Sequence, residues 1–462
     1  MKNFFALIIV CCACNCCLAQ LITKKESDQV TKLLTELSAN LRPASYVVRH
    51  VTVITMKDSI VLQDHDVWIE DGRIKKIGVN LEVPAAIEID GTGKYLLPGL
   101  IDMHGHLLPG HPMMDTWKIH FLLSGVTSIR DMNGMMGVEK LKLRDAISQN
   151  KVFAPTVYQA SQLIDSRKGQ FSEQATTPED GKRLVVEAKK AGFDFIKVYD
   201  GLTADVYHAI IDEARNQQIP VVGHVPSSIA LADALESKQS SIEHLIGFFE
   251  WRDSKTQLHA PDDYALRTAR SETWICPTLY NHRLNLSREL AQSVLKDSAS
   301  GLIPKGLYAT WEKITRNQSK EVVEMVDKNG EASFDVLKKI VLSLDRANAK
   351  LIAGTDAGNL PFLIPGSSLI EELKLLSKIG ISNYEVLEMT TSNAALAMNK
   401  QSTIGTIEEG KRADLILLQH NPIANLNNLY SNKGIMVRGV WISDVERNRI
   451  SKAMSNIFKD DD

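Results

Sequence analysis

Hydrophobic residues follow a helical period at the start of the chain and a strand-like texture after it. Between residues 22 and 42 the apolar positions predict an amphipathic helix, which Pro43 ends. From residue 46 to about 95, short apolar runs are separated by turns, and the same texture returns between residues 405 and 441. Both ends of the chain are therefore expected to build one composite β domain.

Between these two parts, apolar strands alternate with helical stretches, which is the pattern of βα units. Eight such strands with intervening helices predict a closed (β/α)8 barrel. Two long connections, one after the third strand and a helical one at about 281–350, are expected to cover or shape its mouth. The strand candidates are residues 96–101, 126–130, 156–159, 193–198, 220–225, 241–245, 274–278 and 351–355.

The predicted fold class is α/β, with a TIM-like barrel and a small composite β-sandwich domain formed by the N- and C-terminal segments. A chain of 462 residues is long enough for both. The predicted divisions are a signal peptide at 1–19, a helical extension at 20–45, β-sandwich segments at 46–95 and 401–450, a barrel at 96–400 and a tail at 451–462.

The first residues have the form of a secretory leader. Lys2 precedes an apolar run at 4–18, which is too short for a membrane span, and Ala19 follows at the expected cleavage site. Five of the six cysteines lie in this leader, so the mature chain keeps Cys276 alone. We expect a secreted or periplasmic protein; a lipoprotein anchored through a leader cysteine is the alternative.

The composition is that of a globular protein, with 44% hydrophobic residues and a net charge of −3. Because the chain has no basic stretch of useful length, we expect no nucleic-acid partner. The expected partner is a small-molecule substrate. A homo-oligomer is left open.

Two histidines end the first predicted barrel strand. His104 and His106 are separated by one residue, and side chains alternate along a strand, so both imidazoles face the same way. At a rise of about 3.3 Å per residue they are close enough to chelate one ion. Asp102 shares their face and is a candidate partner that fixes the orientation of an imidazole.

Three further groups end other predicted strands: His224 the fifth, His244 the sixth and Asp356 the eighth. Active-site groups of such a barrel come from the carboxyl ends of its strands, so these side chains are expected at one mouth. Imidazole and carboxylate ligands suit Zn²⁺ and similar ions. Taken singly, each histidine could be a satisfied buried group and Asp356 could cap a helix; the joint pattern favours metal binding.

Lys197 lies within the fourth predicted strand. A buried lysine usually pairs with a carboxylate, but a lysine of low pKa could instead be carboxylated by CO₂ and bridge two metals. Candidates for substrate contact follow or end predicted strands: His111, Arg130, Tyr199 and Tyr280.

Seven motifs together resemble the metal-dependent amidohydrolase superfamily, nearest to its imidazolonepropionase-like and Xaa-Pro dipeptidase (prolidase-type) members. They lie at residues 98–106, 125–131, 195–198, 223–225, 242–244, 353–356 and 405–415. The resemblance implies two divalent metals, with Zn²⁺ expected. It implies that His104, His106 and Asp356 bind one metal, that His224 and His244 bind the second, and that carboxylated Lys197 bridges them.

The expected function is an exported amidohydrolase that cleaves an amide or other C–N bond with a metal-activated hydroxide. Asp356 would take a proton from the nucleophile and pass it to the leaving amine. Dipeptides and N-acyl amino acids are the expected substrates, with cyclic amides next. One alternative is an ester, lactone or phosphotriester hydrolase on the same site; another is a non-catalytic binding or scaffold protein that kept the barrel.

Overall fold

The computed structural model describes most of the chain after the leader: residues 21–107, 111–133, 137–169, 172–252, 255–258, 261–296, 301–358 and 360–459. The predicted signal peptide at 1–19 lies outside the described residues. No helix in these described segments is both long and apolar enough to cross a membrane.

The predicted α/β barrel is confirmed. In the described chain, seven parallel strands are hydrogen-bonded in the order β15-β12-β11-β10-β8-β7-β6, with β9 (Ser172–Gln174) beside β8. Nearly all of their residues are buried, as expected for a sheet enclosed by helices. Their bounds are β6 (Leu100–Gly105), β7 (Val126–Asp131), β8 (Thr156–Asp165), β10 (Phe195–Val198), β11 (Val221–Gly223), β12 (Ser241–Glu243) and β15 (Trp274–Cys276).

The eighth predicted strand is not a regular strand. The segment at 351–357 closes the ring through isolated bridges, from Leu351 to Ile275 of β15 and from Ala357 to Gly105 of β6. The backbone of Asp356 has a φ of 67°, in the left-handed region, and this bend ends the extended conformation that a ladder requires. The barrel is therefore closed by irregular backbone that includes the candidate ligand Asp356.

The first predicted strand, 96–101, divides between two sheets. β5 (Tyr95–Pro98) belongs to the terminal sheet and β6 to the barrel, with the change at Gly99. A Cβ at this glycine would lie 2.1 Å from Thr127 Oγ1, so the crossing needs a residue without a side chain. The two sheets are therefore covalently continuous immediately before the histidine-bearing strand.

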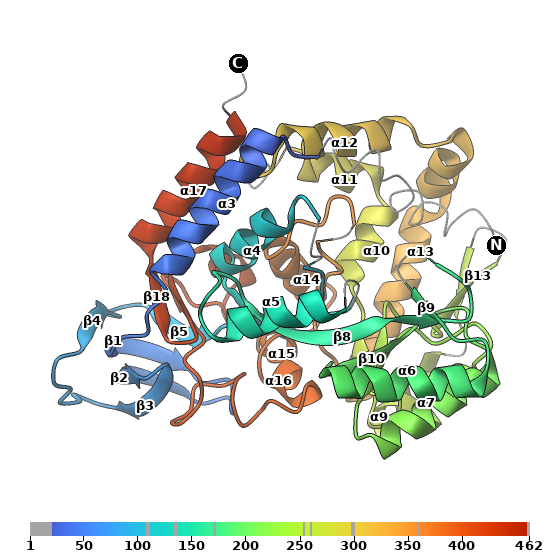
Figure 1. Ribbon diagram of the computed structural model, residues 1–462, viewed down its shortest axis with the longest axis horizontal. Helices are drawn as coiled ribbons and strands as arrows, with labels where there is room; N and C mark the ends of the chain where they lie inside the picture. The colour runs from blue at the N-terminus through green and yellow to red at the C-terminus, as the bar shows by residue number, and fades with distance from the viewer. Residues whose placement is uncertain are drawn as a thin grey trace.

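Helices surround the barrel, and α10 to α13 form the predicted helical insertion (Figure 1). A short hairpin, β13 (Phe249–Arg252) and β14 (Lys255–Leu258), follows β12. The helices are α4 (Met114–Leu123), α5 (Val138–Ser148), α6 (Pro178–Ala191), α7 (Ala204–Asn216), α8 (Leu231–Glu236), α9 (Pro261–Arg270), α10 (Leu279–Asn285), α11 (Arg288–Val294), α12 (Lys305–Arg316), α13 (Lys320–Arg346), α14 (Ser367–Lys378), α15 (Asn383–Met389) and α16 (Ser392–Ala397).

The terminal segments build one mixed sheet, which confirms the composite domain. Its strand order is β18-β17-β16-β5-β1-β2-β3, with β4 paired to β1. The C-terminal strand β16 lies directly beside β5, so neither end forms the sheet alone. The remaining bounds are β1 (Tyr46–Ile54), β2 (Val61–Glu70), β3 (Arg73–Gly78), β4 (Ile87–Asp90), β16 (Leu415–Leu418), β17 (Asn432–Val437), β18 (Val440–Ser443) and the 3₁₀ helix η2 (Leu426–Tyr430).

Two terminal helices lie side by side against the barrel (Figure 1). α3 (Lys24–Ala39) begins with a capping box of Thr23 and Glu26, and it falls within the predicted range. α17 (Asp444–Lys459) runs across the predicted boundary at residue 450. The described part of the predicted tail is therefore a packed helix, because Met454 and Phe458 are buried on its inner face.

Candidate metal centre

The predicted ligands meet at the carboxyl ends of the barrel strands. His104 lies in β6 and His106 directly after it, while His224 and His244 directly follow β11 and β12. The rings of His104 and His244 have centroids 4.5 Å apart, and those of His224 and His244 are 5.2 Å apart. Residues separated by up to 140 positions in the sequence therefore share one mouth, as the strand positions predicted.

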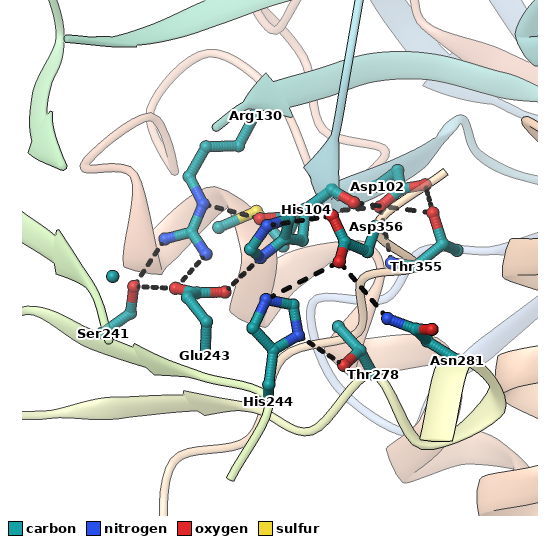
Figure 2. A network of polar contacts seen from close by, with 12 residues as sticks. Asp102, His104, Arg130, Ser241, Glu243, His244, Thr278, Asn281, Thr355 and Asp356 are labelled. Carbon is teal, nitrogen blue, oxygen red and sulfur yellow. Dashed lines mark hydrogen bonds and ion pairs between the residues drawn. The ribbon is translucent and has the colours of Figure 1, made fainter. Parts of the chain in front are cut away.

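Asp356 lies among three of these imidazoles, and Figure 2 shows it beside two of them, His104 and His244. Its Oδ1 lies 2.7 Å from His106 Nε2 and 3.5 Å from His104 Nε2, and its Oδ2 lies 3.8 Å from His244 Nε2. Burial by itself would raise the pKa of this carboxyl, but the surrounding imidazoles hold the pKa far below its usual range. The surrounding imidazoles therefore favour the ionised form of Asp356.

Left-handed backbone conformations aim the side chains at this mouth. Asp356, His244 and Thr278 have φ values of 67°, 60° and 45°. Such conformations cost about 1–3 kcal/mol each for residues other than glycine and concentrate at functional sites. The sharp turns after the strands direct the side chains toward one another.

Three imidazoles are oriented through Nδ1. His104 Nδ1 lies 2.9 Å from Glu243 Oε2, and His224 Nδ1 lies 2.7 Å from Asp200 Oδ1. His244 Nδ1 lies 2.7 Å from Thr278 Oγ1. When these partners accept the Nδ1 proton, each Nε2 keeps a free lone pair for a metal.

Sequence reasoning missed the three partners and assigned such a role to Asp102 instead. That role is wrong. The Asp102 carboxylate accepts the backbone N–H of His104 and both the N–H and the hydroxyl of Thr355, so it joins β6 to the closing segment. Burial raises the pKa of Asp102 to about 7. Glu243 could have been suspected from its place directly before His244, at the end of a strand.

Lys197 is 2% exposed and lies on β10, beside this group. Burial lowers its pKa to about 8, against the opposing effect of the Glu243 and Asp356 carboxylates. A substantial fraction of the amine is therefore neutral at mildly alkaline pH. Gly223, with a φ of 130°, makes room beside it, because a Cβ there would lie 3.1 Å from Lys197 Cδ.

Three of the residues predicted to contact the substrate, Tyr199, Tyr280 and His111, lie in different surroundings. Tyr199 stacks on the His224 ring at 4.3 Å, at the mouth. Tyr280, at the start of α10, is 8% exposed. His111 accepts a hydrogen bond from the Met113 backbone at 3.2 Å, and burial lowers its pKa to about 4. Substrate contact by these three residues stays a prediction.

Arg130 requires a correction. Its side chain is 1% exposed inside the barrel, and its guanidinium donates to three protein oxygens. A substrate cannot reach a group so enclosed. Asn281, which no sequence pattern singled out, lies closer to the reacting groups: its Nδ2 donates to Asp356 Oδ2 at 3.2 Å.

The donor set fits a divalent cation. Ligand atoms of His104, His106 and Asp356 all lie within 4.8 Å of one another. Burial lowers the pKa of His104 to about 4, so this imidazole is neutral at pH 7. With its Nδ1 proton directed at Glu243, its Nε2 lone pair faces a carboxylate oxygen 3.5 Å away. A cation between these two acceptors would remove their repulsion.

Comparisons with known proteins identify the family and support the fold. A model of the Amidohydrolase family matches residues 95–446. The imidazolonepropionase of Geobacillus sp. (strain WCH70) is 27% identical over 393 residues, covering 78% of this chain and 85% of that protein. Bottromycin amidohydrolase has a similar fold, with a TM-score of 0.75 and 24% identity over 95% of both chains. A putative prolidase from Bifidobacterium longum has a TM-score of 0.68 and 23% identity, covering 88% of this chain and 98% of that one.

Proposed function

The chain belongs to the amidohydrolase family, and from this premise we propose that it is an exported binuclear enzyme that hydrolyses dipeptides or N-acyl amino acids. Members of this family hydrolyse C–N bonds in small molecules and generally bind divalent metals. The proposal adds the number and kind of metal ions, two Zn²⁺, and the substrate class. It also adds export.

The observation that carries the proposal is the convergence of three imidazoles on the Asp356 carboxylate. In the proposed centre, His104, His106 and Asp356 hold one ion, and His224 and His244 hold the second. The buried Lys197 amine would be carboxylated by CO₂ and bridge the two ions. The lowered pKa of Lys197 supports this step, because only the neutral amine attacks CO₂.

Bound ions would lower the pKa of water and polarise the scissile carbonyl. The protein's own groups then move the proton. Asp356, ionised among imidazoles, accepts a proton from the attacking water and later donates it to the leaving amine. Asn281 holds Asp356 Oδ2 through its amide and so restricts rotation of this carboxylate. Tyr199, stacked on His224, is placed to contact the substrate beside the second ion.

The experiment is a screen of the purified full-length enzyme against dipeptides and N-acyl amino acids, with metal analysis of the same sample. We expect two metal ions per chain and hydrolysis of a subset of these amides. Asp356→Asn should lower kcat by at least about 10³-fold, since proton transfer and a ligand charge are both lost. A folded, metal-free and inactive protein would contradict the proposal. Faster hydrolysis of esters, lactones or phosphotriesters would show that these compounds, and not amides, are the substrate class.

The Lys197 bridge has its own test. Intact mass measurement in bicarbonate buffer should show a carbamate adduct in the wild type and none in Lys197→Ala. If Lys197→Ala keeps two metals and full activity, the bridge is wrong.

Export is tested on the mature protein. N-terminal sequencing of material from the native host is expected to begin at Gln20, after the leader. A lipid-modified leader cysteine would instead support the lipoprotein alternative.

A further inference from the structure

A fully enclosed polar network of Arg130, Ser241 and Glu243 lies beside His104 of the candidate metal centre (Figure 2). Arg130 and Glu243 are 1% and 0% exposed, and Arg130 Nη2 lies 2.7 Å from Glu243 Oε1. Arg130 Nη1 donates to Ser241 Oγ at 2.8 Å, and Arg130 Nε donates to the carbonyl of Met103 at 2.6 Å. Glu243 Oε2 in turn lies 2.9 Å from His104 Nδ1.

Such a pair is costly to bury for stability alone. Removing two charges from water costs several kcal/mol per ion, which their attraction offsets only when the geometry is good and the remaining donors are satisfied. A well-packed apolar pair is often as stable. The fixed place of this pair, in contact with a predicted ligand, indicates a role in orientation.

Glu243 is not free to bind metal itself. Its Oε1 accepts from both Arg130 and Ser241, and its Oε2 faces the imidazole of His104. Although His104, Glu243 and Cys276 lie close enough to form a metal site, the carboxylate therefore serves as a charged acceptor for the Nδ1 proton.

Arg130 controls His104 from two sides. Through Glu243 it acts on the imidazole, and through the Met103 carbonyl it holds the backbone one residue before His104. The first contact selects the tautomer with the proton on Nδ1, and the second fixes the strand position from which the ring projects. Both leave Nε2 turned toward Asp356.

We propose that Arg130 is a positioning residue that, through Glu243, sets the metal affinity of the site formed by His104, His106 and Asp356. The inference rests on the proposed metal centre and assigns Arg130 a task different from substrate binding. Loss of such a partner behind a ligating histidine typically weakens metal binding about 10- to 100-fold.

The test measures Zn²⁺ affinity of the full-length protein by competition with a chromophoric chelator, together with the visible spectrum of the Co²⁺-substituted protein. Arg130→Met should weaken binding of one of the two ions about 10- to 100-fold and change the Co²⁺ spectrum. Arg130→Lys, which restores the charge without the three-way geometry, should recover part of the affinity. Ser241→Ala, the mildest change, should weaken binding by a smaller factor.

The matched control is Lys140→Met. Lys140 and Asp131 form another enclosed ion pair, at 2.7 Å and with side chains 1% and 0% exposed. Asp131 is the residue next to Arg130 on β7. In the described part of the chain its carboxylate accepts from Lys140 and from the backbone N–H groups of Leu107 and Asn133, and from no candidate ligand. This variant should therefore lose stability and keep Zn²⁺ affinity. Should Arg130→Met not fold, Ser241→Ala and Arg130→Lys still decide the question.

The outcomes distinguish failure of the proposed metal centre from failure of the positioning role of Arg130. A wild type without stoichiometric metal refutes the proposed centre. The positioning role alone is refuted if the wild type binds two ions and the variants keep the same Zn²⁺ affinity and Co²⁺ spectrum. These variants are Arg130→Met, Arg130→Lys and Ser241→Ala. Equal losses of affinity in Lys140→Met would also overturn it, since any buried pair would then have the same effect.

Discussion

Three imidazoles of the candidate centre are oriented by hydrogen bonds to Glu243, Asp200 and Thr278. Glu243 and Asp200 are carboxylates, which raise the basicity of the histidine that they hold. Thr278 is neutral, and it occupies a left-handed conformation that β-branched residues rarely adopt. Of these three histidines, His244 therefore has the weakest hydrogen-bond partner, and that partner, Thr278, has a strained left-handed backbone.

Thr278→Ala is expected to weaken Zn²⁺ binding about 10-fold, because His244 loses its hydrogen-bond partner. Thr278→Ser keeps the hydroxyl and should remain within a few-fold of the wild type. The measurement is metal content after dialysis against a chelator series, with kcat on the best amide substrate. Equal metal retention in the alanine and serine variants would show that the hydroxyl does not orient His244.

Among the structural elements, the closing segment at 351–357 packs closely against a candidate ligand, His104. A Cβ on Gly354 would lie 2.6 Å from the His104 backbone nitrogen and 2.7 Å from Cys276 Sγ. These neighbours are backbone and a buried side chain, so they cannot move aside easily. The segment accordingly needs glycine at this point to close the barrel.

Gly354→Ala should destabilise the protein by about 1–3 kcal/mol and lower its metal content, because overpacking displaces β6 and His104. Gly301→Ala is the matched control, since a Cβ there meets nothing within 4 Å. Urea denaturation compares the two variants. Wild-type stability and metal content in Gly354→Ala would mean that the segment relaxes freely.

The terminal sheet contains a carboxylate with a pH-dependent role. Asp66 accepts hydrogen bonds from the backbone of His50 and Leu81 and from the Arg49 side chain. Burial alone would raise the pKa of Asp66, but these donors hold the pKa below its ordinary value. A carboxyl with a lowered folded-state pKa stabilises the protein above the unfolded pKa of about 3.9, and this contribution is lost as the pH falls through the folded pKa.

Asp66→Asn should therefore cost about 1–3 kcal/mol at pH 7 and flatten the loss of stability in acid. Chemical denaturation between pH 2 and 7, about the range in which carboxyls titrate, would check this. Asp64→Asn, at an exposed position of the same strand, is the control and should resemble the wild type. If the free energy of unfolding of Asp66→Asn and of the wild type changed with pH in parallel, Asp66 would not contribute to the acid sensitivity of the protein.

For the whole molecule, the two ends of the chain join the terminal sheet to the barrel. α3 lies beside α17 and contacts α4, where Thr31 donates to Asp115 at 2.8 Å. The apolar positions of α3 are buried in the same hydrophobic cluster as the barrel helices. Helices predicted as an extension and a tail are therefore parts of the folded body.

Leu34→Ala should lower the free energy of unfolding by about 2–5 kcal/mol, because it leaves a cavity between α3 and the barrel. Activity at low temperature should not change, since α3 contributes no residue to the candidate centre. Lys32→Ala, on the exposed face of the same helix, is the control. Thermal unfolding is the measurement, and a wild-type melting temperature in Leu34→Ala would show that α3 is only loosely docked.

Local patterns were enough to predict most of the architecture. Alternation and helical periods identify strands and helices, and strand ends identify His104, His106, His224 and His244, because these signals depend on neighbouring residues. The composite origin of the terminal sheet followed from similar textures at both ends. The irregular eighth segment was not predicted, since an apolar run does not show where its backbone turns left-handed.

Only the tertiary structure decided which side chains orient each candidate ligand. Glu243 and His104 are 139 positions apart, and the Asp102–Thr355 bond joins residues 253 positions apart. No period in the sequence connects such pairs, because their proximity arises when the barrel closes and parallel strands come into register. The sequence by itself therefore determined the kind of chemistry and the strands that carry it. Closure of the barrel decided that Arg130 is enclosed beside the candidate metal ligands, with its side chain 1% exposed.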